Sequence, residues 1–289
     1  MIIVCGASGQ LGRRVVEHLK ERTDAARIVG LSRTPEKISD LGVATRAADF
    51  DDPGSLVRAF DGADRLYFIS TDQMGSSRIT QHTNAINAAV QAGVGHVFYT
   101  SQSKANEPDN PAIVMPDHRA TEEALAASGL RYTSLRYNLY SDIFLLMPAA
   151  SAVSGGVFAT NRGDTGAAYI SREDCAVVGA AALAMDGDPG RVLEVTGPES
   201  VTGTEVAAIL SDICGRQITS QALTDDQFVE GAVSSGAMIE PMARGFATFG
   251  QAVREGYFDI VTDVAERLTG GKPTSVAEFL AANRAAFGG

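Results

Sequence analysis

Apolar runs and amphipathic stretches alternate along the first part of the chain, up to residue 137. Each apolar run is short, continuous and rich in branched or aromatic residues, which is typical of strands buried on both faces. The stretches between them place apolar residues at helical spacing. Strands are predicted within residues 2–5, 27–33, 41–49, 66–70, 96–101 and 130–137, and helices within 10–22, 52–60, 79–92 and 116–128.

This alternation predicts an α/β fold, a Rossmann-type doubly wound parallel sheet with helices on both faces. After residue 140 helices dominate, and short strands such as 191–196 are isolated. Capping boxes at Thr202–Glu205 and Ser275–Glu278 each precede an apolar periodic stretch. We therefore expect a Rossmann domain over 1–140, able to regain a strand or helix from the C-terminal part, and a smaller, mainly helical substrate-binding lobe over 141–289.

The N-terminal segment carries three regularly spaced glycines, Gly6, Gly9 and Gly12. They follow the first predicted strand and open the first predicted helix, where glycine lets the backbone approach a pyrophosphate closely. The helix N-terminus then points at that anion. An ordinary turn is the alternative, because glycine is also common in turns. The strand-to-helix context favours a dinucleotide site.

Ligands of doubly wound sheets lie beyond the carboxyl ends of the strands. This rule places Ser70, Thr71, Ser101 and Tyr137 around the same crevice as the glycine loop. Asp49 ends the third predicted strand, where it either meets an adenine or caps the turn.

Arg33 closes the second predicted strand, where an NAD site usually carries an Asp or Glu for the ribose 2′-hydroxyl. No acid occupies that position. A guanidinium suits a 2′-phosphate instead, through charge-assisted hydrogen bonds. The alternative is a solvated arginine at a strand end, but the missing acid together with Arg33 favours NADP(H).

The chain lacks the Tyr-x-x-x-Lys pair that standard short-chain dehydrogenases use for proton transfer. The matching helix carries His118 and Glu122, which share a helix face and could orient an imidazole near the nicotinamide. An ordinary exposed pair is an equally good interpretation, so no catalytic residue is assigned. The histidines show no metal-ligand spacing, so no metal site is expected.

The formal net charge of −11 and the lack of a Lys/Arg run argue against nucleic acid as a partner. No apolar run is long enough for a membrane span, and no leader precedes the first strand, so a cytoplasmic protein is expected. The cysteines Cys5, Cys175 and Cys214 are widely separated, which favours small buried side chains over a disulfide.

The chain resembles the NmrA-like group of atypical short-chain dehydrogenases, and within it the branch of quinone oxidoreductase 2 and triphenylmethane reductase. The motifs that carry the resemblance are Gly-Ala-Ser-Gly-Gln-Leu-Gly at 6–12, Ser-Arg-Thr-Pro-Glu-Lys at 32–37, Phe-Tyr-Thr-Ser at 98–101 and Leu-Arg-Tyr-Asn-Leu-Tyr-Ser-Asp at 135–142. The resemblance implies that NADP(H) is held by Gly6, Ala7, Ser8, Gly9, Gln10, Leu11, Arg33, Ser70, Thr71, Asp72, Tyr137 and Asn138.

Three functions are compatible with these features. The first is an NAD(P)H-dependent oxidoreductase that passes a hydride from NADPH to a quinone or a similar flat, conjugated acceptor, a small-molecule partner. The second is an NADP(H)-binding redox sensor without turnover, since the group also includes such regulators. An epimerase or dehydratase is the third and least favoured function, because such enzymes normally need the Tyr-x-x-x-Lys pair that this chain lacks. A homodimer is left open.

Overall fold

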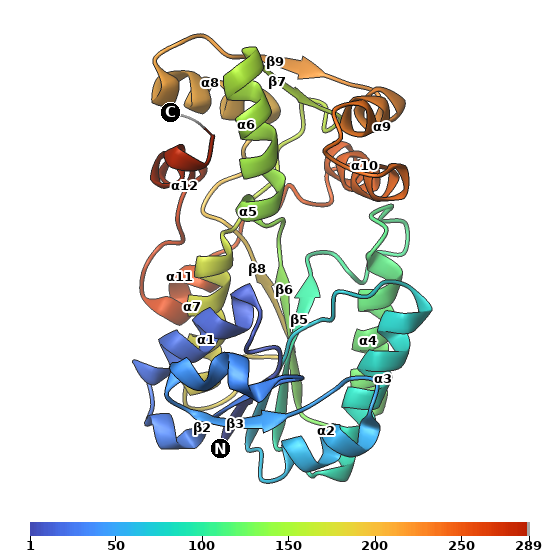
Figure 1. The fold of residues 1–289 in the computed structure, drawn as a ribbon, viewed down its shortest axis with the longest axis vertical. Coiled ribbons are helices and arrows are strands. Elements are labelled where there is room, and N and C mark those ends of the chain that lie inside the picture. Colours follow the sequence, from blue (N-terminus) through green and yellow to red (C-terminus); the bar gives the residue numbers. More distant parts are fainter. Residues whose placement is uncertain (288–289) are drawn as a thin grey trace.

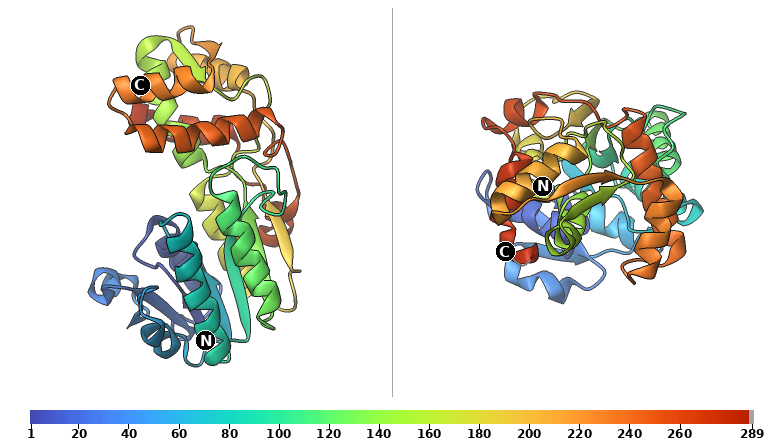
Figure 2. Two further views of the ribbon diagram at one scale, coloured as in Figure 1. Left: turned by 90° about the vertical axis from the view of Figure 1, so that its right-hand side faces the viewer. Right: turned by 90° about the horizontal axis from the view of Figure 1, so that it is seen from above.

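The computed structural model describes residues 1–287 of the chain. It has two lobes, one built on a parallel sheet and one mainly helical (Figure 1). The helical lobe stands beyond the carboxyl ends of the strands. In the side view of Figure 2 the lobes join along one side of the molecule and stand apart on the other.

The large sheet has seven strands in the order β3-β2-β1-β4-β5-β6-β8, all parallel. The strand order reverses between β1 and β4, which is the point where doubly wound sheets bind ligands. This topology confirms the predicted fold class. The strands are β1 (Ile2–Val4), β2 (Ile28–Ser32), β3 (Ala44–Ala47), β4 (Arg65–Phe68), β5 (His96–Gln102), β6 (Tyr132–Tyr137) and β8 (Val192–Val195).

Helices cover both faces of this sheet, and each face has its own apolar core. The predicted helices of the first part are present, with ends that differ by a few residues at most. One face carries α1 (Gln10–Lys20), α7 (Arg172–Ala184) and α11 (Val264–Thr269), and the other carries α2 (Pro53–Phe60), α3 (Ser76–Gln91) and α4 (Met115–Ala127). Short 3-10 turns follow α1 and β2 at Ala25–Arg27 and Pro35–Leu41.

The helical lobe packs around a separate core and a small parallel sheet of two strands, which the sequence pattern did not predict. Both predicted capping boxes are present, at the starts of α8 and α12. The elements of this lobe are α5 (Ser141–Phe144), α6 (Leu146–Gly155), β7 (Val157–Thr160), α8 (Gly203–Cys214), β9 (Thr219–Ala222), α9 (Asp225–Ser234), α10 (Glu240–Arg254), α12 (Val276–Ala282) and a 3-10 turn at Arg284–Phe287.

Strand β8 was predicted to be isolated, and that prediction is wrong. It pairs with β6 over Ser134↔Val192 to Tyr137↔Val195 and forms the last strand of the large sheet. The sheet thus regains a strand from the C-terminal part, together with the outer helices α7 and α11. The predicted domain boundary at residue 140 stays a proposal. It marks the point where the chain first leaves the sheet lobe, and later segments return to that lobe.

A pair of buried tyrosines joins the sheet to α7. Tyr137 donates its hydroxyl hydrogen to the Cys175 carbonyl oxygen at 3.0 Å and accepts a hydrogen bond from Tyr67 at 2.8 Å. Gly179 lies directly above this pair, and a Cβ there would be 2.6 Å from the Tyr67 hydroxyl oxygen. The absence of a side chain therefore sets how closely α7 approaches the sheet.

We expect Gly179→Ala to lower the free energy of unfolding by about 1–3 kcal/mol, because the added methyl group forces the tyrosine pair apart. Chemical denaturation measures the change. The matched control is Gly231→Ala in α9, where an added Cβ meets nothing within 4 Å. That variant should be neutral or more stable, since alanine favours a helix over glycine. Equal destabilisation of both variants would contradict the explanation.

Candidate cofactor site

A cleft of about 490 Å³ opens at the carboxyl ends of the central strands. It lies at the switch point of the sheet, where the sequence predicted a ligand. Its walls come from the glycine loop, from the ends of β2 and β3, and from the segment that joins β4 to α3. The lining residues are Gly6, Ser8, Gly9, Leu31, Ser32, Arg33, Ala48, Asp49, Phe50, Asp51, Ile69, Ser70, Thr71, Asp72, Gln73, Ser77 and Gln81.

The glycine loop turns tightly from β1 into α1. Gly6 has φ +63°, a conformation that residues with a side chain rarely adopt, and its carbonyl oxygen accepts a hydrogen bond from the Gly9 N–H at 2.9 Å. A Cβ at Gly12 would lie 2.3 Å from that same carbonyl oxygen. Gly9 caps α1, so the unpaired N–H groups of the first turn are available to an anion.

Not every predicted residue of this loop presents its side chain to the cleft. Gly6, Ser8 and Gly9 line it, whereas the Ala7 and Leu11 side chains are buried in the apolar core. Ala7 donates its backbone N–H to the Leu31 carbonyl oxygen at 2.9 Å, which ties the loop to β2. Gln10 is exposed at the start of α1.

Arg33 is exposed at the end of β2 and lines the cleft beside Ser32. The Ser32 hydroxyl donates to the Ser8 hydroxyl at 3.2 Å and accepts the Thr34 N–H at 3.1 Å. These bonds join the end of β2 to the glycine loop. The arrangement places Arg33 in the wall of the cleft, and its contact with a ribose 2′-group stays a prediction.

The far end of the cleft includes residues that the sequence reasoning missed. Asp49 was considered, but Phe50, Asp51 and Gln81 were not. The Gln81 amide donates to both carboxylate oxygens of Asp51 at 3.0 Å, which joins α3 to the end of β3. The Phe50 ring stacks on Phe68 with centroids 5.7 Å apart. The position of Phe50 and Asp51 just after the third strand was the signal available in the sequence, whereas Gln81 on α3 gave none.

Tyr137 and Asn138 were predicted to contact the cofactor, but the structure directs both side chains into the protein interior. The Tyr137 hydroxyl is held by Tyr67 and Cys175, and burial raises the pKa of the phenol well above its usual value. The Asn138 amide donates to the Phe258 carbonyl oxygen at 3.2 Å and accepts the Leu139 N–H at 2.7 Å. Neither lines the cleft, so their role stays a prediction.

The side chains of His118 and Glu122 do not act as a pair. His118 Nδ1 lies 2.7 Å from the Tyr99 hydroxyl, in the core between α4 and the sheet. Burial and the nearby Arg78 hold the pKa of His118 well below its usual value, so the imidazole is neutral. Glu122 instead accepts hydrogen bonds from Ser101 at 2.6 Å and from the Arg136 guanidinium. Neither residue lines the cleft.

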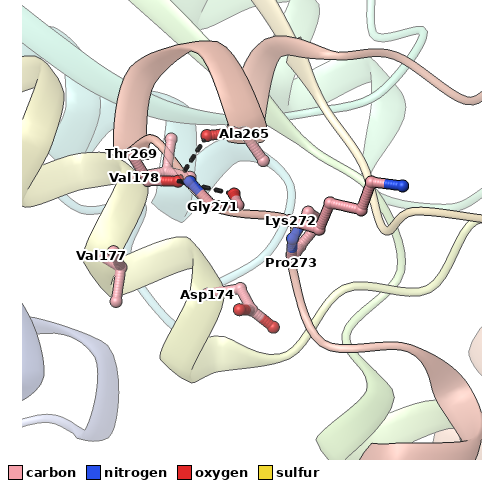
Figure 3. Close-up of a pocket in the computed structure, with 8 residues that line it drawn as sticks. All are labelled: Asp174, Val177, Val178, Ala265, Thr269, Gly271, Lys272 and Pro273. Carbon is pink, nitrogen blue, oxygen red and sulfur yellow. Dashed lines mark hydrogen bonds between the residues drawn. The ribbon is translucent and has the colours of Figure 1, made fainter.

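A second, smaller cavity of about 220 Å³ lies between α7 and α11, away from the cleft (Figure 3). Its polar groups serve the local structure: Thr269 accepts the Gly271 N–H at 3.3 Å and donates to the Ala265 carbonyl oxygen at 2.8 Å. Lys272 extends away from Asp174, whose carboxylate accepts the Thr274 N–H at 3.2 Å. This cavity offers no converging set of ligand groups.

Within residues 1–287 no group of three or more His, Cys, Asp or Glu side chains could hold a metal ion. A search of the same part of the chain finds no helix that is both long and apolar enough to cross a membrane.

The family model that matches this chain describes NAD(P)H-binding proteins and covers residues 6–186. The chain belongs to this NAD(P)H-binding family. The matched region includes the glycine loop, Arg33 and the segment after β4, so the family and the cleft point to the same ligand class. Relatives named below place the chain in the predicted NmrA-like group of atypical short-chain dehydrogenases.

Similar proteins extend over the whole chain. Quinone oxidoreductase 2 of Escherichia coli (strain K12) is 35% identical over 281 residues, which is 96% of each protein. An NAD(P)H azoreductase of Xenophilus azovorans is 29% identical over 100% of this chain and 99% of its own. The crystal structure of Citrobacter sp. triphenylmethane reductase complexed with NADP(H) matches with a TM-score of 0.92 at 31% identity, covering 98% of this chain and 99% of that one.

The residues of the cleft fit a nicotinamide dinucleotide. The glycine loop leaves the first N–H groups of α1 unpaired for a pyrophosphate. Thr71 Oγ1 and Gln81 Oε1 are buried in the cleft wall and have no hydrogen-bond partner among the described residues. Both atoms are shielded from solvent, so they add polarity to this wall but are not themselves open to a ligand.

We expect Gly9→Val to abolish dinucleotide binding while the protein stays folded. A side chain at Gly9 would occupy the space that the pyrophosphate needs, whereas the backbone there, with φ −84°, is one that valine adopts, and its Cβ would meet only the Gly6 carbonyl oxygen, at 3.3 Å. Fluorescence titration with NADPH measures binding, and circular dichroism checks the fold. Unchanged affinity in the folded variant would show that the loop is only a turn.

Proposed function

We propose that the protein is an NADPH-dependent oxidoreductase that transfers a hydride to a quinone or a similar flat, conjugated acceptor. The observation that carries this proposal is the full-length likeness to quinone oxidoreductase 2, which includes the helical lobe as well as the cofactor domain. The azoreductase and the triphenylmethane reductase match over the same length and are also named as reductases.

NADPH is the cofactor that the cleft favours. The N–H groups at the start of α1 would bind its pyrophosphate, and Arg33 would bind the 2′-phosphate. No carboxylate ends β2, so the ribose 2′-hydroxyl of NADH would lack its usual partner.

The helical lobe offers aromatic surface for a flat acceptor. Phe246 and Phe249 on α10 are half-buried and pack against Phe144 with ring centroids 5.8 and 5.2 Å away. These rings belong to the lobe that stands beyond the strand ends (Figure 1). Apolar rings favour stacking and exclude water, which places an acceptor without a specific polar contact.

When bound, NADPH supplies the hydride. The chain supplies position rather than a strong acid: His118 is neutral and turned toward Tyr99, and the Tyr137 hydroxyl is held in the core. A quinone that gains a hydride spreads its negative charge over the ring system and can take its proton from water. The proposed reaction therefore suits a site without Tyr-x-x-x-Lys.

The same missing pair favours a second candidate, an NADP(H)-binding redox sensor without turnover. Purified protein mixed with NADPH and a benzoquinone distinguishes the two functions. Steady loss of NADPH absorbance supports the reductase. Tight binding of NADPH without its consumption, across several quinones and azo dyes, would overturn the reductase and support the sensor.

A cytoplasmic location is part of the proposal. It is supported by Cys5 and Cys175, which are buried as free thiols, as expected in a reducing compartment. A homodimer also stays a proposal, and sedimentation velocity would test it.

We expect Arg33→Asp to erase or reverse a preference for NADPH over NADH. A charged hydrogen bond to the 2′-phosphate contributes about 1.5–3 kcal/mol, which corresponds to roughly ten- to a hundredfold in affinity. Titration of wild type and variant with both cofactors measures the preference. Arg13→Gln is a suitable control, because Arg13 pairs with Asp40 at 2.6 Å. Equal affinities of the wild type for NADPH and NADH would contradict the assignment.

We expect His118→Asn to slow hydride transfer by no more than about tenfold, whereas a true general acid contributes roughly 10²–10⁴-fold. Asparagine can place an amide atom near Nδ1 and keep the bond to Tyr99. Because the pKa of His118 is low, we also expect that its titration causes no change of the rate with pH near neutrality. Stopped-flow measurement across pH tests both points, and loss of a limb in the variant would identify a missed acid.

A further inference from the structure

Residues 71–75 belong to the segment 69–75 that joins β4 to α3, and this segment forms one wall of the cofactor cleft. Thr71, Asp72 and Gln73 line the cleft. The middle of the loop is exposed, with Met74 at 47% exposure. Both ends of the loop, in contrast, are bound by buried side chains that come from the neighbouring helices.

At the first end, the Thr71 N–H donates to His82 Nε2 of α3 at 3.1 Å. His82 Nδ1 lies 2.8 Å from Thr121 Oγ1 of α4. At the second end, the Gly75 N–H donates to Asp117 Oδ2 of α4 at 2.8 Å. His82, Asp117 and Thr121 are all buried, so their side of each bond is shielded from water.

The hydrogen atoms of this network can have only one arrangement. A backbone N–H can only donate, so His82 Nε2 must accept, and the single hydrogen of a neutral imidazole is on Nδ1. Thr121 Oγ1 then accepts from His82 and donates its own hydrogen to the Asp117 carbonyl oxygen at 2.7 Å. The hydrogen bonds therefore connect Thr71 to the backbone of Asp117, and the Asp117 carboxylate holds Gly75.

Burial, aided by Arg78, keeps His82 in the neutral state that this arrangement needs. The Arg78 guanidinium lies 3.6 Å from the Asp117 carboxylate, and both side chains are less than one-tenth exposed. Burial and the positive charge of Arg78 lower the pKa of His82 from 6.5 to about 3. In a protonated imidazole, Nε2 carries a hydrogen and points it at the Thr71 N–H, so the hydrogen bond between them is lost.

We propose that His82, Thr121 and Asp117 are positioning residues that hold loop 71–75 in the shape that receives NADPH. The inference rests on the proposed cofactor, and it adds that helices α3 and α4 form this wall before the cofactor arrives. A loop without these ties would be ordered only on binding, and the cost of ordering would weaken the affinity.

The chain contains a matched control for this network. His96 Nε2 lies 2.9 Å from Thr133 Oγ1, and Thr133 donates to the Gly190 carbonyl oxygen at 2.7 Å. His96 is also buried, but it begins β5, at the opposite end of the strand from the cleft. The same His–Thr–carbonyl arrangement therefore occurs once beside the cofactor loop and once away from it.

The test compares Thr121→Val, Thr121→Ser and Thr133→Val. NADPH affinity is measured by fluorescence titration without any acceptor, and backbone hydrogen exchange is followed at Thr71 and Gly75. Thr121→Val should raise the NADPH Kd about tenfold and speed exchange at the Thr71 amide, because His82 loses its partner, whereas the Gly75 amide keeps its bond to the Asp117 carboxylate and should exchange as in the wild type. Thr121→Ser, which keeps the hydroxyl, should bind within about twofold of wild type, as should Thr133→Val.

Two results would overturn the inference. One is an unchanged Kd together with unchanged exchange at Thr71 in Thr121→Val, and the other is equal weakening by Thr133→Val, which would show a general loss of stability. If Thr121→Val does not fold, His82→Gln and His82→Leu replace it: glutamine keeps an acceptor for Thr71 and should bind NADPH more tightly than leucine. A wild type that binds NADPH but reduces no quinone refutes the proposed activity alone.

Discussion

The close approach of α1 to the glycine loop is the constraint on which the cofactor site depends. A side chain at position 12 would lie 2.3 Å from the Gly6 carbonyl oxygen, so only glycine lets the helix start where it does. That contact directs the N-terminus of α1 at the cleft. It also keeps Ser8 within reach of Ser32, which brings the end of β2 and Arg33 to the same cleft.

Burial favours the neutral forms of the tyrosines, the cysteine and the histidines behind this site, while Arg78 and Asp117 form a buried ion pair. Burial raises the pKa values of Tyr67, Tyr137 and Cys175, and together with Arg78 it lowers those of His82 and His118. These buried tyrosines and histidines therefore provide shape and hydrogen bonds rather than groups that ionise near neutral pH. Reaction chemistry that relies on the cofactor is consistent with such surroundings.

Local patterns were enough to predict most of the first part of the fold. The strand–glycine–helix segment and the capping boxes are each encoded within a few residues, and all are present. Long-range partners were not encoded in this way. Strand β8 is short and pairs with β6, far earlier in the chain, so its membership of the sheet could not be read from residues 192–195 alone.

The candidate site shows the same limit. The positions of Arg33 and the glycine loop in the cleft could be predicted from their places at the ends of strands. For Tyr137, in contrast, the pleat of β6 turns the side chain toward α7 rather than toward the cleft. His118 was judged by its helix face, whereas its partner Tyr99 comes from a strand. Gln81 entered no motif, and only its bond to Asp51 brings it to the cleft wall.

The return of β8, α7 and α11 to the large sheet has a mechanical consequence. The chain passes between the lobes repeatedly rather than once, and in Figure 2 these passages gather along one side. A joint made of several parallel segments resists twisting far more than a single linker does. Rotation of one lobe against the other is thereby more restricted than it would be with a single linker, and the helical lobe keeps its position beyond the carboxyl ends of the strands.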